Sequence, residues 1–191
     1  SRGLGDVYKR QLLEQGKGDI WDSGKIESDA SQWITYQGKT LKCNASYYWK
    51  VKIDTNKGAT NWSAPAFWTT GLFNEADWQG QWIGLDRAAP GDSETQWSRL
   101  AARYLRKEFA VKKDVKRATV HIAGMGLYEL FINGQRIGNQ VLAPAPTDYR
   151  KTILYNTYDV TSLLQTENAI GVTLGNGRFY TMRQNYKPCL L

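Results

Sequence analysis

Apolar and polar residues alternate along much of the chain, a period-2 pattern that is typical of strands with one buried face. It is clearest over residues 47–53, where aromatic and aliphatic side chains occupy every second position and Lys50 faces away from Tyr47. Turn-forming residues at 54–58 lead to a second such stretch at 66–70, which predicts an antiparallel hairpin. Shorter strand candidates precede it at residues 20–25 and 32–36.

Strand signals recur at short intervals from residue 103 onward, as an all-β sandwich requires. The predicted strands occupy residues 104–109, 117–123, 127–132, 135–138, 153–158 and 169–174. Asn133-Gly134 is predicted to form a type I′ hairpin turn, because both central positions of that turn need positive φ. Asp159 is predicted to accept backbone N–H bonds at the start of a short helical turn. No longer helix is indicated, so the predicted fold class is all-β.

The length of 191 residues suits two small domains, each with its own core. A boundary is expected between Gly71 and Gln81, in a connector that carries Trp78 and Trp82. Two roles stay open for these tryptophans. Their rings can stack on the C–H face of a sugar, or they can cement a contact between domains, which is the commoner use of a large aromatic residue in a connector.

Little in the sequence suggests catalytic or metal chemistry. Cys43 and Cys189 lack the paired spacing of a zinc site and are too few for a disulfide framework. The sequence has no phosphate-binding loop, no nucleophile elbow and no apolar run long enough to span a membrane. His121, the single histidine, is predicted to be a solvated surface residue. Acidic pairs fall in predicted loops, so no catalytic residue is assigned.

The net charge of +7 is concentrated between Arg99 and Arg117, where eight Lys or Arg residues accompany two acidic ones. A patch of this kind can attract an anionic partner. The same stretch holds strand-like apolar residues and a lysine-rich loop, without a nucleic-acid-binding motif. A solvated charged face is therefore favoured, and no nucleic-acid partner is expected.

Two resemblances give the domains a family. The strand that begins at Tyr47, together with Trp62-Ser63-Ala64-Pro65 and the final Phe67-Trp68-Thr69-Thr70-Gly71, resembles the end of a fibronectin type III domain. The second half resembles the N-terminal domain of the α-L-rhamnosidases of glycoside hydrolase family 78. The motifs that carry this resemblance are RYLRKEF at 103–109, GMGLYELFING at 124–134, PTDY at 146–149, YDVT at 158–161 and LGNG at 174–177.

The order of these motifs is specific, although each motif alone is weak. The stretch DIWDSGK at 19–25 and the tryptophan connector agree with it, because they look like the region before this domain in Bacteroides-type rhamnosidases. One departure is that Arg178 follows LGNG, where many relatives carry Trp. A sugar contact made by that Trp is therefore in doubt.

The resemblance implies a truncated fibronectin III-like sandwich followed by a jelly-roll-like β-sandwich. The parent would be an inverting α-L-rhamnosidase, whose acid and base carboxylates flank the glycosidic bond. Those carboxylates lie in a downstream (α/α)-barrel, and neither its helices nor its acidic motif occurs here. The family also implies rhamnose-containing glycans or glycosides as partners, a periplasmic or extracellular location, and no cofactor beyond a candidate calcium ion.

Both ends resemble foreign sequence. Residues 1–11 (SRGLGDVYKRQ) are similar to a translated sequencing-adapter read-through that contaminates metagenomic genes, and residues 189–191 to its opposite-strand version. The alternative is a natural polar N-terminus and an ordinary C-terminal strand. The predicted organisation is a foreign tail at 1–11, a partial fibronectin III-like domain at 12–72, a linker at 73–90, the rhamnosidase N-terminal domain at 91–188 and a foreign tail at 189–191.

Related jelly-roll modules of the family hold rhamnose, in some cases with calcium, at a loop edge of the sandwich. The residues that fall where such loops are expected are Asn133, Asp148, Tyr149, Asn176, Arg178 and Tyr180. The resemblance implies that Tyr149 or Tyr180 stacks on the sugar, and that Asp148 or Asn176 supplies oxygen ligands to calcium. A structural role is the favoured alternative for any single residue, because the asparagines precede glycines and an Asp can cap a loop.

Three functions follow from these interpretations. The chain is expected to be the non-catalytic N-terminal part of a rhamnosidase, with scaffold and substrate-recognition roles. The alternatives are a stand-alone carbohydrate-binding module and a structural spacer of a surface protein. Rhamnose affinity in the isolated chain supports the carbohydrate-binding module, whereas the spacer is expected to show no sugar binding and no barrel downstream in the gene.

Overall fold

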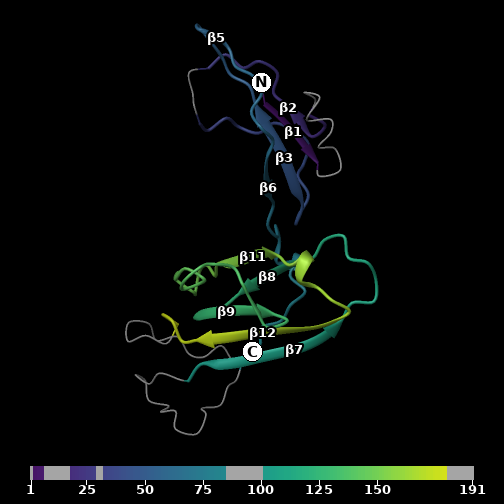
Figure 1. Cartoon of the computed structure of the whole chain (residues 1–191). Coiled ribbons are helices and arrows are strands. Elements are labelled where there is room, and N and C mark those ends of the chain that lie inside the picture. Colours follow the sequence, from purple (N-terminus) through teal and green to yellow (C-terminus); the bar gives the residue numbers. More distant parts are fainter. Residues whose placement is uncertain (1, 7–17, 29–31, 85–100, 180–191) are drawn as a thin grey trace. The chain divides into compact units, whose positions relative to one another are not determined.

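Figure 1 shows the computed structural model of the chain, which describes residues 2–6, 18–28, 32–84 and 101–179. These residues form strands and short 3-10 turns and contain no α-helix, so the predicted all-β class is confirmed. None of the helical turns in this part of the chain has the length or apolar character needed to cross a membrane. The chain divides into two compact units after Gly80, inside the stretch predicted to be a linker.

The first unit is built on an antiparallel sheet in the order β2-β1-β3-β6. Its strands are β1 (Arg2–Asp6), β2 (Trp21–Asp22), β3 (Ser46–Val51) and β6 (Ala66–Thr69), with a small hairpin of β4 (Asp54–Thr55) and β5 (Gly58–Ala59). β3 pairs with β6, which confirms the predicted hairpin. The strand predicted at residues 32–36 is absent, because Trp33 has a φ of 61° that extended backbone does not contain.

β1 lies within the segment that the sequence analysis predicts to be a foreign tail. It pairs with β3 along its whole length and with β2 at two positions. A backbone pairing says nothing about where a sequence came from, so the foreign origin of residues 1–11 stays a prediction.

β3 is not buried on one face and exposed on the other, as the alternating pattern predicted. Tyr47 is 2% exposed, but Trp49 on the same face is 38% exposed, and Lys50 on the opposite face is only 4% exposed. The Lys50 ammonium lies 4.7 Å from the ring centroid of Trp62, a cation–π distance. The alternating pattern within β3 does not predict the burial of Lys50, because the Trp62 ring that covers it lies outside the strand, 12 residues further along the chain.

The second unit packs two sheets together, a four-stranded one in the order β10-β9-β12-β7 and a two-stranded one of β11 and β8 (Figure 1). Each predicted strand is present to within two residues at either end. The strands are β7 (Arg103–Ala110), β8 (Thr119–Ala123), β9 (Leu127–Ile132), β10 (Gln135–Ile137), β11 (Tyr155–Asp159) and β12 (Glu167–Gly175).

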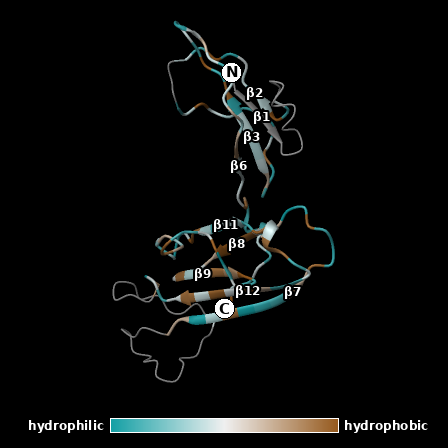
Figure 2. Cartoon of the chain, viewed as in Figure 1, coloured by the Kyte–Doolittle hydropathy of each residue, from teal (hydrophilic) through white to brown (hydrophobic). Residues whose placement is uncertain are grey.

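The core of this unit lies between its two sheets. Leu130 and Ile132 of β9 are each 1% exposed, and Val120 and Ile122 of β8 pack against the cluster that contains them. Figure 2 shows the same division, with hydrophobic residues concentrated on β8, β9 and β12 and hydrophilic ones along most of β7. The lysines of the basic stretch, on β7 and in the following loop, are exposed, as expected of a solvated charged face.

Two local predictions in this unit are confirmed. Asn133 and Gly134 have φ values of 51° and 80°, as a type I′ turn requires, and they join β9 to β10. The Thr161 N–H donates to Asp159 Oδ1 at 2.9 Å, where the 3-10 turn η3 (Thr161–Leu163) begins. Hydrogen bonds from the Thr161 hydroxyl and N–H lower the pKa of the Asp159 carboxyl.

His121 is half-buried rather than solvated, which corrects the prediction. β11 lies opposite β8 and places Thr157 beside it, with 2.9 Å between His121 Nδ1 and Thr157 Oγ1. The Tyr155 ring also meets the imidazole, at a centroid distance of 5.9 Å. Burial, and then the charge of Arg117, lower the pKa of His121.

We expect the free energy of unfolding of the second unit to fall as the pH is lowered from about 7 towards 5. The unfolded chain binds the His121 proton first, because the folded-state pKa is the lower of the two. The contribution of His121 to the free energy of unfolding is therefore fully present above the pKa of the unfolded state. It is lost as the pH falls towards the lower pKa that His121 has in the folded state. Denaturant unfolding across this range measures the effect, and His121→Gln is expected to flatten it. An unchanged slope in that variant contradicts the assignment.

Candidate carbohydrate-binding site

Two of the predicted site loops meet at one end of the second sandwich. β12 ends at Gly175, whose register partner on β9 is Leu127. The segment before β9, residues 124–126, therefore lies beside the segment after β12, which begins with Asn176.

Glycines allow these two segments to touch. Gly126 has a φ of 131°, and a Cβ there would overlap the carbonyl oxygen of Gly175. Gly177 has a φ of 49°, and its Cβ would lie 2.9 Å from the carbonyl carbon of Gly126. Only glycine combines such φ values with so close an approach. The GMG and LGNG motifs thereby fix the backbone that carries Asn176 and Arg178.

Tyr149 and Phe179 connect a third loop to this end of the sheet. Their side chains are buried, and their ring centroids lie 5.6 Å apart at an interplanar angle of 86°, an edge-to-face contact. The Tyr149 ring therefore packs within the protein and presents little of its face to solvent. Phe179 is not among the site residues predicted from the sequence, although it directly follows Arg178, the residue that departs from the family pattern.

Asp148 forms a turn and an ion pair at the surface. Its Oδ1 lies 3.0 Å from Arg150 Nε, and its carbonyl oxygen accepts the N–H groups of Lys151 and Thr152. The Arg150 guanidinium also donates to Oδ2 at 3.3 Å. This geometry matches the structural alternative, in which Asp148 caps a loop, and the Arg150 partner was not expected from the sequence.

Asn133 lies at the other end of the same sheet. Ile132, just before it, pairs with Ile170 near the start of β12, whereas Asn176 follows the end of that strand. Its Nδ2 donates to Leu163 O and to Asn168 Oδ1, both at 3.0 Å, and its Oδ1 accepts the Ala169 N–H at 2.8 Å. The structure does not bring Asn133 together with the other predicted site residues.

The loops that carry Asp148 and Asn176 offer few side-chain oxygen ligands for the predicted calcium ion. Calcium takes six to eight oxygen ligands, and the Asp148 carboxylate already pairs with Arg150. Within the described ranges, no group of three or more His, Cys, Asp or Glu side chains is placed to hold a metal. Tyr180, the second predicted stacking residue, lies outside the described residues.

The connector is anchored to the first unit through Asp77, at the end of the 3-10 turn η2 (Glu75–Asp77). Its Oδ2 accepts the Asn74 N–H at 2.9 Å, the Cys43 thiol at 3.3 Å and the Phe73 N–H at 3.0 Å, and these hydrogen bonds lower the pKa of Asp77. Trp78 is half-buried and Trp82 is exposed. Both roles considered for these tryptophans stay predictions.

Both units are all-β, and the second is a sandwich of two packed sheets with glycine-built loops at one end, which places the chain among the multi-domain β-sandwich proteins. The family model of the Rha78A-like N-terminal immunoglobulin domain matches residues 6–74, and that of the alpha-L-rhamnosidase N-terminal domain matches residues 113–189. The chain belongs to the α-L-rhamnosidase family and corresponds to its N-terminal region. The immunoglobulin and fibronectin III descriptions share the same two-sheet sandwich architecture.

Individual relatives support the same family assignment as the two family models. An alpha-L-rhamnosidase of Formosa agariphila is 38% identical over 191 residues, covering 92% of this chain and 20% of the relative, and one of Alteromonas sp. is 36% identical, covering 83% and 18%. The solved alpha-L-rhamnosidase from Dictyoglumus thermophilum has a TM-score of 0.82 at 39% identity, covering 93% of this chain and 21% of that one. The enzyme from Aspergillus terreus has a TM-score of 0.71 at 29% identity, covering 93% and 19%. The chain thus spans about a fifth of the length of these proteins.

Proposed function

We propose that this chain serves an inverting, exported α-L-rhamnosidase as a non-catalytic part that supports the barrel and helps to recognise terminal α-L-rhamnose. The observation that carries the recognition role is the pair of glycine-built segments before β9 and after β12, which hold Asn176 and Arg178 in place. The names of the relatives support the choice of sugar.

The polar groups at this end suit a neutral sugar. The Asn176 amide offers both donors and acceptors, and the exposed Arg178 guanidinium offers donors to neighbouring hydroxyls. Asp148 adds a carboxylate that remains partly exposed beside Arg150. Tyr149 and Phe179 supply a rigid support beneath these groups, because their buried rings lock the loops together.

Calorimetric titration of the whole chain with L-rhamnose tests this site, with L-fucose as a second 6-deoxy sugar and with calcium or a chelator in parallel. We expect saturable binding of rhamnose that Asn176→Ala weakens by up to about tenfold, the value of one or two neutral hydrogen bonds. Asn139→Ala is the matched control, because Asn139 is exposed and outside these loops.

The outcomes separate the alternatives. Rhamnose binding that Asn176→Ala weakens supports the recognition role, and loss of binding with chelator adds calcium to the site. Absence of heat at millimolar rhamnose leaves only the scaffold role or the structural spacer. A gene that encodes no barrel after this region, combined with strong binding, favours a stand-alone carbohydrate-binding module.

A further inference from the structure

The outer face of the four-stranded sheet in the second unit carries a hollow of about 260 Å³. Its floor is formed by Ala169, Gly171 and Thr173 of β12. This is the face turned away from the core, since Ile170 and Val172 pack inward and strand side chains alternate between faces. The hollow is therefore distinct from the loop site at the end of the sheet. A ligand could occupy it whether or not the loop site binds a sugar.

Gly171 keeps the centre of this face open although the fold does not require a glycine there. A Cβ at Gly171 would meet only the Phe131 Cβ at 3.8 Å, an ordinary contact, and its φ lies outside the region that favours glycine. Glycine in a central strand weakens the sheet relative to a residue with a side chain, and such a position often marks the close approach of a ligand. β12 is a central strand, because it lies between β7 and β9.

Aromatic rings flank this open floor. Phe131 of β9 is the register partner of Gly171 on one side, and Tyr104 of β7 lies opposite Thr173 on the other. Tyr104 is 81% exposed, so its ring face is available to a ligand. A large exposed ring beside a glycine forms a shallow platform with an apolar surface.

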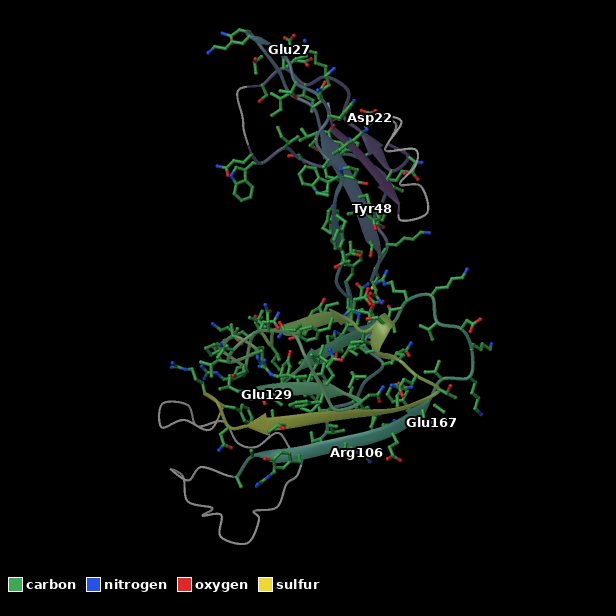
Figure 3. The ribbon with its side chains drawn as sticks, viewed as in Figure 1. Asp22, Glu27, Tyr48, Arg106, Glu129 and Glu167 are labelled. Atoms are coloured by element: carbon green, nitrogen blue, oxygen red, sulfur yellow. The ribbon has the colours of Figure 1, made fainter. Side chains whose placement is uncertain are left out.

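Two ion pairs add polar groups without net charge. Arg106, the β7 partner of Gly171, lies 2.6 Å from Glu108, and Arg136 lies 3.2 Å from Glu129. Figure 3 labels Arg106 on β7 and Glu129 on β9, the strands on either side of β12. Each basic group is matched by an acidic one, so the face combines planar hydrogen-bonding groups with balanced charge.

We propose that this face binds the ring of a neutral sugar, stacked on Tyr104 over Gly171 and hydrogen-bonded by Arg106 and the surrounding carboxylates. A neutral pyranose has the matching character, with an apolar C–H face and a rim of hydroxyls. The hollow is smaller than the pockets of about 300–1,000 Å³ that hold drug-sized ligands, which suits a single ring. A protein partner requires about 800 Å² per side with an apolar centre, whereas this patch is narrow and bordered by charges.

The test is an amide NMR titration of the whole chain with methyl α-L-rhamnoside, methyl β-D-glucoside and xylobiose as probes. We expect at least one probe to shift the Tyr104, Phe131 and Gly171 signals. Gly171→Val is expected to abolish these shifts while the midpoint of thermal unfolding stays level or rises, since a β-branched residue suits a strand. Tyr104→Ala is expected to weaken binding by about tenfold.

Matched controls are Gly80→Val, which adds the same side chain at a glycine with open space around it, and Phe67→Ala, which removes another exposed ring. Shifts confined to residues 174–179 and unaffected by Gly171→Val would overturn this proposal while supporting the loop site. Absence of any shift at Gly171 with all three probes overturns it as well. If Gly171→Val unfolds the chain, the fold does require a glycine at this position. The Tyr104→Ala variant then decides, and sugar binding that this variant leaves unchanged rejects the site.

Discussion

Leu130→Ala is expected to destabilise the second unit by about 2–5 kcal/mol, the usual cost of removing a fully buried leucine. Leu130 is 1% exposed at the centre of β9, and its neighbours come from both sheets, so the space it leaves cannot collapse easily. A small domain has only about 5–15 kcal/mol of stability. We therefore expect the thermal midpoint of this unit to fall by roughly 10 °C or more.

Amide hydrogen exchange on β9 and β12 measures this loss in the second unit by itself, whereas a single melting curve would combine two units. Leu154→Ala is the matched control, because Leu154 is 41% exposed and outside the strands. Its effect is expected to stay within about 0.5 kcal/mol. Equal losses in the two variants would show that Leu130 is not the centre of the core.

Gly126→Ala is expected to cost about 3 kcal/mol or more, because two penalties add at one position. The φ of 131° is strained for any residue with a side chain, and the new Cβ would overlap the carbonyl oxygen of Gly175. The segments before β9 and after β12 must separate to admit it. Asn176 is carried on the second segment, so chemical shifts of residues 174–179 are expected to change along with stability.

Gly134→Ala is the control that separates the cost of backbone strain at positive φ from the cost of steric overlap by a new Cβ. Gly134 also has a positive φ, of 80°, but a Cβ there meets nothing within 4 Å. This variant is expected to lose only the conformational term, about 1–3 kcal/mol, and to leave residues 174–179 unchanged. If Gly126→Ala cost no more than Gly134→Ala, the close packing of the two loops would not be what requires glycine.

Strands and turns of the second unit were predictable because their signals are local. Alternation fixes which side chains share a face, and Asn133-Gly134 fixes a turn type through the φ values that it tolerates. The site was predictable only in part. The loops that hold Tyr149, Asn176 and Arg178 do meet at one end of the sheet. The position of Asn133 in the sequence did not predict that it lies at the other end.

Burial was the property that local pattern predicted least well. Lys50 lies on the face expected to be polar, yet Trp62 covers it, and His121 is half-buried because β11 pairs beside it. Both outcomes depend on residues far away in sequence. The short run at 32–36 also failed as a strand, since a single left-handed residue, Trp33, overrides the alternating pattern.

The sequence by itself determined the all-β class, the positions of the second unit's strands to within two residues, the Asn133-Gly134 turn and the resemblance to a rhamnosidase N-terminal region. These follow from residues that are neighbours in the chain, or from motifs in a fixed order. Only the tertiary structure decided which loops converge, why Gly126 and Gly177 must be glycines, and that Gly171 opens a hollow between Tyr104 and Phe131. The reason is that close approach and burial belong to pairs of strands, and pairing joins residues that no local pattern connects.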